Sequence, residues 1–219
     1  MGPAAVESGQ QREDDAGFLF VGENLAIDLV NTEIVERGKP IDLLARPGAY
    51  ARWWQAAASR YPELAGELAS SQAKPEFMAS VLALRAALRA VFDAIAAESP
   101  VPPQGLATLN RTLATSHDAV ALDPAGAPQP LLVPSGPETD GPQACVAREA
   151  FTLLTRADRS RLHRCANGRC VLLFYDTTKS ATRRWCSTTC MNRARSAERY
   201  RQHKQGKLVL GEASVSGKR

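Results

Sequence analysis

The sequence has few of the residues and motifs on which most enzymes depend. Histidine occurs three times in 219 residues, and aromatic residues make up 6% of the chain. The sequence has no glycine-rich phosphate-binding loop, no G-x-S-x-G nucleophile elbow and no H-E-x-x-H motif. Few general bases are therefore at hand, and we expect a protein that is not an enzyme.

The sequence also lacks the segments that direct a chain to a membrane. The first seventeen residues, MGPAAVESGQQREDDAG, are polar and acidic, and they have no apolar stretch of the signal-peptide type. No run of 18 apolar residues occurs anywhere, so no membrane-spanning helix is predicted. We expect a cytoplasmic protein without membrane contact, with a disordered leader over residues 1–17.

Cysteine is scarce too, but four of the five cysteines form two close pairs. Four residues separate Cys165 from Cys170, three separate Cys186 from Cys190, and fifteen lie between the pairs. This spacing is typical of a tetrahedral zinc site with four thiolate ligands. Two disulfides and an iron–sulfur cluster are the alternatives, and the lack of a signal peptide argues against disulfides. We predict one Zn²⁺ per chain, held by these four cysteines.

The residues around the cysteines predict a small ββα module. VLLFYDTT (171–178) can form one strand and RRWC (183–186) the other, with a turn between them. Ser187 is a suitable helix N-cap, and residues 188–204 contain no glycine or proline, so a helix is expected to start at the second cysteine pair. Because about 40 residues bury little apolar surface, zinc binding would supply much of the free energy of folding.

Charge is distributed unevenly along the chain. Residues 156–207 carry fourteen Lys or Arg against three Asp or Glu, whereas residues 1–155 carry eleven basic and nineteen acidic side chains. The near-neutral total therefore combines a cationic segment around the cysteines with an acidic N-terminal part. Such a cationic segment indicates a nucleic-acid partner, and its alternatives are a solvated face or docking onto the acidic part.

Three polar or basic residues of the predicted helix share one face. Asn192, Arg195 and Arg199 recur at helical spacing. A helix fits the major groove of double-stranded DNA, where Asn can pair with adenine and Arg with guanine. We therefore predict base contacts from Asn192 and Arg195. Phosphate contacts are predicted for four flanking arginines: Arg183, Arg184, Arg193 and Arg199.

The same segment resembles the CGNR zinc fingers. In that family a first cysteine pair is followed by LFxDxS, a basic turn, RRWCS and a C-G-N-R tetrad that opens a basic helix. Here the corresponding stretches are LFYDTT, RRWCS and Cys190-Met191-Asn192-Arg193, with Met191 in place of the tetrad glycine and Thr178 in place of the usual serine. The resemblance implies a zinc-binding, DNA-binding module of bacterial transcription regulators. A zinc-stabilised adaptor that binds protein or RNA is the alternative.

The N-terminal part predicts a mainly helical domain over residues 18–155. Its strongest signal is a continuous apolar stripe from Pro75 to Glu98, formed by Phe77, Val81, Leu84, Leu88, Val91 and Ile95. Arg85 and Arg89 fall off the stripe and are expected to be solvated. Four further helices are predicted. The first runs from Leu25 to before Gly38 with Ile34 facing inward, the second begins at Pro47, and the others cover residues 103–116 and 143–155. Residues 117–142 predict a small β-hairpin or a linker.

Three residues of this domain are candidates for binding a small-molecule effector. Asp28 and Asn31 are polar residues among apolar ones, and their other interpretation is a cap or a buried hydrogen bond. Trp53 stands next to Trp54, and adjacent residues point about 100° apart on a helix. One of the two tryptophans can therefore pack in the core while the other lines a groove.

Residues 20–32 (FVGENLAIDLVNT) and 42–54 (DLLARPGAYARWW) resemble the ABATE domain, which commonly precedes the CGNR finger. The resemblance implies a stress-responsive regulator whose N-terminal domain senses a signal or dimerises. One small module buries only about 600–1,000 Å² on DNA, so we expect a homodimer with its interface in the N-terminal domain. The zinc finger is expected over residues 158–205, and a flexible tail over 206–219.

Overall fold

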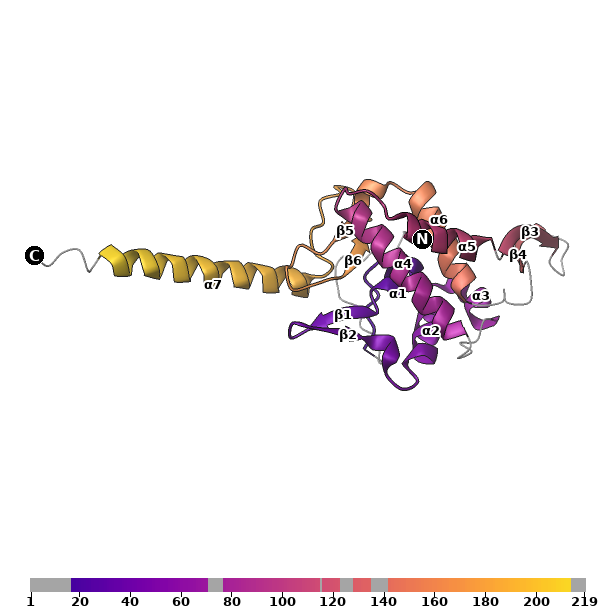
Figure 1. Ribbon diagram of the computed structural model, residues 1–219, viewed down its shortest axis with the longest axis horizontal. Coiled ribbons are helices and arrows are strands. Elements are labelled where there is room, and N and C mark those ends of the chain that lie inside the picture. Colours follow the sequence, from indigo (N-terminus) through magenta and orange to yellow (C-terminus); the bar gives the residue numbers. More distant parts are fainter. Residues whose placement is uncertain (1–16, 71–76, 115, 123–127, 135–141, 214–219) are drawn as a thin grey trace, which may run out of the picture.

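The computed structural model describes residues 17–70, 77–114, 116–122, 128–134 and 142–213. The expected leader lies outside these ranges apart from Gly17, and so do the last six residues of the expected tail. A body of helices carries a long terminal helix that projects from one side, and a β-hairpin lies at the opposite side (Figure 1). In the part of the chain that is described, no helix is long and apolar enough to cross a bilayer.

Over the residues that are described, the helical body is built from six α-helices. They are α1 (Leu25–Val30), α2 (Ala49–Arg60), α3 (Ala65–Ser70), α4 (Met78–Ala96), α5 (Pro103–Leu113) and α6 (Gln143–Thr155). The C-terminal part holds β5 (Leu162–Arg164), β6 (Leu173–Tyr175) and α7 (Thr188–Ala213). Single turns of 3₁₀ helix at Leu43–Ala45, Pro62–Leu64 and Arg159–Arg161 connect the larger elements.

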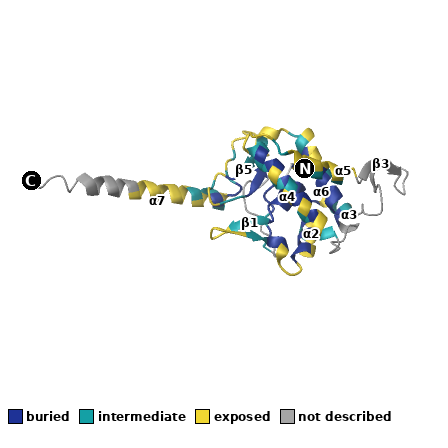
Figure 2. Ribbon diagram, in the orientation of Figure 1, coloured by how far each residue is buried: buried dark blue, intermediate teal, exposed yellow. Residues whose placement is uncertain are grey.

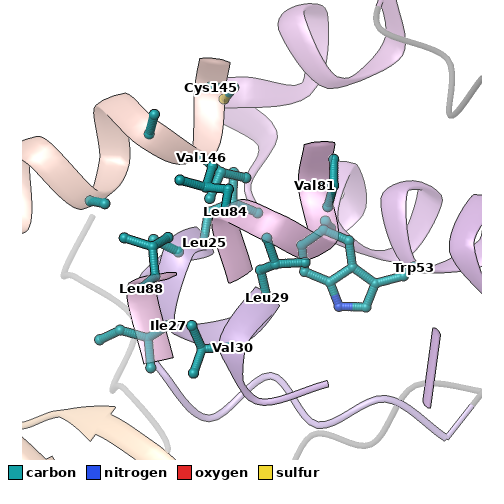
Figure 3. Close-up of a cluster of buried hydrophobic side chains, with 14 of the residues drawn as sticks. Leu25, Ile27, Leu29, Val30, Trp53, Val81, Leu84, Leu88, Cys145 and Val146 are labelled. Carbon is teal, nitrogen blue, oxygen red and sulfur yellow. The ribbon is translucent and has the colours of Figure 1, made fainter. Parts of the chain in front are cut away.

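The core is organised around α4, as its apolar stripe predicted. Val81, Leu84, Leu88 and Val91 are fully buried, and α4 packs against α1, α5 and α6. Figure 3 shows side chains of α1, α2, α4 and α6 meeting around Leu84. The two ends of the stripe, at Phe77 and Ile95, are only half-buried, because they lie at the ends of the helix where fewer elements cover them.

The first helix is shorter than expected, and a hairpin takes its place. Asn24 caps α1 through a hydrogen bond from Ala26 N (3.0 Å), and the helix ends at Val30. The antiparallel strands β1 (Glu33–Glu36) and β2 (Lys39–Asp42) follow, with Ile34 opposite Ile41. The prediction of a helix to before Gly38 was wrong, because residues 33–36 pair instead with residues 39–42. Arg37 and Gly38, with positive φ of 50° and 79°, make the tight turn that this pairing requires.

The strands on either side of residues 123–127 form a second hairpin, which decides between the hairpin and the linker predicted over residues 117–142. Strand β3 (Ser116–Leu122) pairs antiparallel with β4 (Pro128–Pro134). The preceding helix α5 ends at Leu113, three residues before the expected end. The mainly helical N-terminal part with a small hairpin, followed by strands and a helix around the cysteines, confirms the predicted fold class.

Candidate metal centre and nucleic-acid interface

The four paired cysteines meet at one point. Their Sγ atoms all lie within 4.8 Å of one another, and Cys170 Sγ is 3.8 Å from Cys186 Sγ. Zinc–thiolate bonds of about 2.3 Å in a tetrahedron require sulfur atoms about 3.8 Å apart. All five cysteines of the chain lie in its described part, and all are free thiols. The donor set and its geometry therefore fit one Zn²⁺ per chain, and the two-disulfide alternative does not describe this arrangement.

Local structure holds each thiol in place. Cys165 directly follows β5, and the backbone folds back so that Cys170 N donates to Asn167 O (2.8 Å). Cys190 lies in the first turn of α7, where Ser187 Oγ accepts a hydrogen bond from Cys190 N (3.2 Å). The predicted N-cap is confirmed, and it fixes the orientation of the last ligand.

The strand pairing in the finger differs from the prediction. Strand β6 pairs with β5, which precedes the first cysteine pair, and not with residues 183–186. Asp176 accounts for the difference, since its Oδ1 accepts from Thr178 N (2.9 Å) and its Oδ2 from Arg183 N (2.8 Å). Burial opposes the charge on Asp176, but these hydrogen bonds outweigh it and lower the pKa of the carboxyl group. The backbone at Arg183 is therefore tied into a loop and is unavailable to a strand ladder.

The four thiols are close enough to share hydrogen bonds, which shift their pKa values in opposite directions. Hydrogen bonds from Cys170 and Cys186 lower the pKa of Cys165 to about 7, and hydrogen bonds from the other three thiols lower that of Cys190. Hydrogen bonds to the neighbouring thiols raise the pKa of Cys170 and Cys186. Zinc binds all four cysteines as thiolates, so it would release the protons that remain. Cys145 lies apart in α6, where burial raises its pKa to about 12, and it packs as a small apolar residue.

The finger is joined to the helical body and is not suspended from a linker. Asn31 Nδ2 donates to Leu173 O and Leu173 N donates to Asn31 Oδ1, both at 2.9 Å. Tyr175 N donates to Gly22 O (3.1 Å). Leu162 and Leu173 belong to the same buried cluster as α1 and α4. The base of the finger thus shares one core with the N-terminal helices.

Two arginines of α4 make buried or half-buried contacts, although they were expected to be solvated, and one of them, Arg89, reaches the finger. Arg85 is 4% exposed and donates to both carboxylate oxygens of Asp42 (2.7 and 2.6 Å). Arg89 donates to the backbone carbonyls of Val30 (2.6 Å) and Val171 (2.8 Å). That prediction was wrong because the partners of both side chains lie on elements distant in the sequence, which the helical periodicity of α4 does not reveal.

The candidate effector residues all lie in the core. Asp28 Oδ1 accepts from Gly22 N (2.6 Å), and Asp28 Oδ2 accepts from the hydroxyl of Tyr61. Burial raises the pKa of Asp28 to about 7. A side chain at Gly22 would place its Cβ 2.6 Å from Asp28 Oδ1, so this close approach requires glycine. Trp53 is 1% exposed, and Trp54 beside it is also buried, so neither tryptophan lines a groove.

The six predicted DNA-contacting residues divide into two groups. Asn192, Arg193, Arg195 and Arg199 lie exposed on α7, and Arg184 is exposed just before it. Figure 2 shows the described part of α7 as a largely exposed rod beside the buried body. Arg183 is used inside the finger: its guanidinium lies 4.4 Å from the Phe174 ring centre and donates to the carbonyls of Trp185 (3.1 Å) and Cys186 (2.5 Å).

The helix is longer than predicted. α7 runs to Ala213 and passes through the region where a flexible tail was expected to begin at residue 206. The helix therefore extends well beyond the zinc site, as Figure 1 shows.

A groove of about 490 Å³ separates the β1–β2 hairpin from the finger. Its apolar wall includes Ile34, Val35 and Ile41, and Arg164 and Val171 of the finger complete it. Arg164 reaches across to α4, 3.6 Å from Asp93. Sequence reasoning missed this groove and its residues, because no local pattern indicates that the hairpin and the finger are neighbours.

Comparison with known families agrees with both parts of the chain. The ABATE family model, described as "Putative stress-induced transcription regulator", matches residues 23–157. The model of the CGNR zinc finger matches residues 161–204. The order of the two segments is the one predicted from the sequence motifs. No curated protein matches the chain significantly.

Proposed function

Because the chain belongs to the ABATE family and carries a CGNR zinc finger, we propose that it is a zinc-dependent transcription regulator that binds double-stranded DNA through α7. The observation that carries this proposal is the exposed, cationic helix α7 whose first turn is fixed by a zinc ligand, Cys190. The zinc site would orient the helix, and the helix would enter the major groove. The role is regulatory and not catalytic.

The contacts are assigned by position on α7. Asn192 and Arg195 lie in the first two turns of α7, and we assign them to base edges, because the early residues of a recognition helix point into the groove. Arg193 and Arg199 flank them and are assigned to phosphates, together with Arg184. Arg183 was predicted to contact phosphate, but its hydrogen bonds within the finger favour a supporting role.

Binding to duplex DNA as a function of salt tests the proposal. The zinc-loaded protein should select a preferred sequence from random duplex. A plot of its log Kd against the logarithm of the salt concentration should have a slope of several units. The same protein after zinc removal should bind weakly and without preference, because α7 loses its anchor. A zinc-stabilised adaptor for protein or RNA would show neither sequence preference nor a steep dependence on salt.

We propose that the protein acts as a homodimer, since a second finger would double the buried DNA surface. The neighbouring helices α5 and α6 expose Leu106 (38%) and Phe151 (42%), which supports an interface in the N-terminal domain. Light scattering at micromolar concentration should give twice the monomer mass, and Phe151→Glu should give the monomer. Thr152→Glu, an exposed neighbour, is the matched control; a monomeric parent would contradict the proposal.

A small-molecule effector, if one acts on this protein, would enter the groove between the hairpin and the finger. The groove is lined by both parts of the chain, so a bound compound could alter how the finger is held. Val35→Trp should fill the groove. A compound that raises the Tm of the parent and not of this variant would support the assignment, and an equal effect on both would contradict it.

A further inference from the structure

A second hollow lies on the finger itself, and no residue of α7 in the described part of the chain lines it. It has a volume of about 270 Å³ and is formed by β5 and by the segment that precedes Trp185. We call it the basic notch; the polar and charged residues that line it are His163, Arg164, Thr182, Arg183 and Arg184. Among the residues that the structure describes, no Asp or Glu lines it. Its chemistry is that of an anion site.

Two of the three arginines are available to a ligand. Arg183 is engaged with Phe174 and with backbone carbonyls inside the finger. The Arg164 side chain is 51% exposed, and its ion pair with Asp93 is long, at 3.6 Å. A pair so open to solvent contributes little free energy, so an anion can compete for Arg164. Arg184 is exposed as well.

The backbone beneath the notch is held in a fixed shape. Ala166 N donates to Arg184 O (2.8 Å), which ties one rim to the other. Asp176 fixes the backbone of Arg183 (2.8 Å), and Ser180 Oγ is 2.9 Å from the Thr182 hydroxyl. A preformed site orders few groups on binding and so loses little free energy in the process.

The notch is continuous with the start of α7. The guanidinium carbon of Arg184 lies 5.3 Å from the centre of the Trp185 ring, and that of Arg195 lies 5.9 Å from it. Trp185 thus places a residue of the notch and a residue of α7 around one ring. The cationic surface extends from α7 across Trp185 to β5.

We propose that the basic notch binds a phosphate group of the DNA backbone through Arg164 and Arg184. Guanidinium groups bind phosphate oxygens in a bidentate manner, and the Thr182 hydroxyl can donate to a third oxygen. The inference rests on the proposed function. It extends the contact surface of the finger from α7 to β5, so that the duplex backbone crosses the zinc site.

Salt-dependent binding of Arg164→Gln to random duplex tests the notch. Loss of one phosphate contact should lower the log–log slope by about one unit and weaken all sequences alike. Arg169→Gln is the matched control, because Arg169 is an exposed arginine of the same finger outside the notch; its slope should equal that of the parent. Zinc content and Tm of each variant confirm that the finger is intact.

Asp93→Asn separates phosphate binding from the ion pair on α4. If Arg164 acts only by pairing with Asp93, Asp93→Asn will reproduce the loss of slope and affinity seen in Arg164→Gln. The proposal that the notch binds phosphate would then be wrong. If Arg164 contacts phosphate, Asp93→Asn will keep the slope of the parent. If the parent has a steep salt slope and Arg164→Gln has the same slope, the proposal that the notch binds phosphate is overturned and the proposed function is not. A parent that shows no salt-dependent DNA binding overturns the proposed function and the notch together.

Discussion

Asn31 and Leu173 exchange two hydrogen bonds of 2.9 Å although they lie 142 positions apart in the sequence. The side-chain amide of Asn31 uses one N–H of its NH2 group and its carbonyl oxygen to pair with the backbone of β6, as the backbone of a neighbouring strand would. A residue at the end of α1 therefore holds the strand that leads into the zinc site. The same amide would transmit a displacement of α1 to the finger.

Asn31→Ala should lower the free energy of unfolding by about 2–4 kcal/mol, because the buried N–H and C=O of Leu173 lose their partners. Asn110→Ala, on the exposed surface of α5, removes the same side chain without this consequence. Chemical denaturation of both variants is the measurement. If the two variants unfold at the same denaturant concentration, the amide does not anchor β6.

The raised pKa of Asp28 should make the stability of the protein depend on pH. Burial raises its pKa to about 7 from 3.8, so in the folded protein the carboxyl group holds its proton at a pH where the unfolded chain has lost it. The stability that Asp28 contributes is present in full below pH 4 and is lost as the pH rises to 7.

Asp28→Asn cannot titrate, so the stability of the parent relative to this variant should fall between pH 4 and pH 7. The change should be of the order of 2–4 kcal/mol, at about 1.4 kcal/mol per pKa unit. Denaturant unfolding of both proteins at several pH values measures it. Parallel stability curves over this range would show that Asp28 does not titrate with a raised pKa.

Leu84→Asp should be among the most damaging single substitutions. Leu84 is fully buried at the centre of the stripe on α4, and an unpaired charge there costs several kcal/mol. Ala86→Asp places the same carboxylate on the exposed face of the same helix and should change the Tm by only a few degrees. Thermal unfolding followed by circular dichroism compares them; a Leu84→Asp protein that melts with the parent would remove α4 from the core.

Cys186→Ser should abolish zinc binding and unfold the finger while most of the N-terminal helices remain, because metal binding supplies the folding free energy of that segment. Elemental analysis should give one zinc per chain for the parent and almost none for the variant. Cys145→Ala, which removes the thiol outside the site, should retain the zinc. Iron in place of zinc, or full zinc in Cys186→Ser, would contradict the assignment of the ligands.

The sequence predicts the parts of the fold that depend on residues close together in the chain. Cysteine spacing predicted the metal site, the apolar stripe predicted α4, and Ser187 predicted the start of α7. The pairing of β6 could not be predicted, since it depends on Asp176 capturing the backbone of Arg183. The hydrogen bonds of the half-buried Arg89 likewise go to carbonyls 59 and 82 positions away in the sequence.

In the candidate site, too, some features follow from the local sequence and others depend on partners distant in the chain. The positions of Asn192 and Arg195 on an exposed helix follow from periodicity, and the structure places both there. Arg164 carries no local signal for a role in binding, because only the fold brings β5 beside Arg184. Residues whose partners are distant in the sequence are therefore the ones that the sequence leaves undecided.

The central claim, that α7 reads bases, is tested most directly by comparing the affinities of Asn192→Ala and Arg199→Ala for a selected duplex and for random duplex. Asn192→Ala should lose about 1–3 kcal/mol on the selected duplex through one base position and little on random DNA. Arg199→Ala should weaken binding to both duplexes alike and lower the salt slope by about one unit. Equal losses on selected and random duplex for both variants would contradict the claim and show that this helix reads no bases.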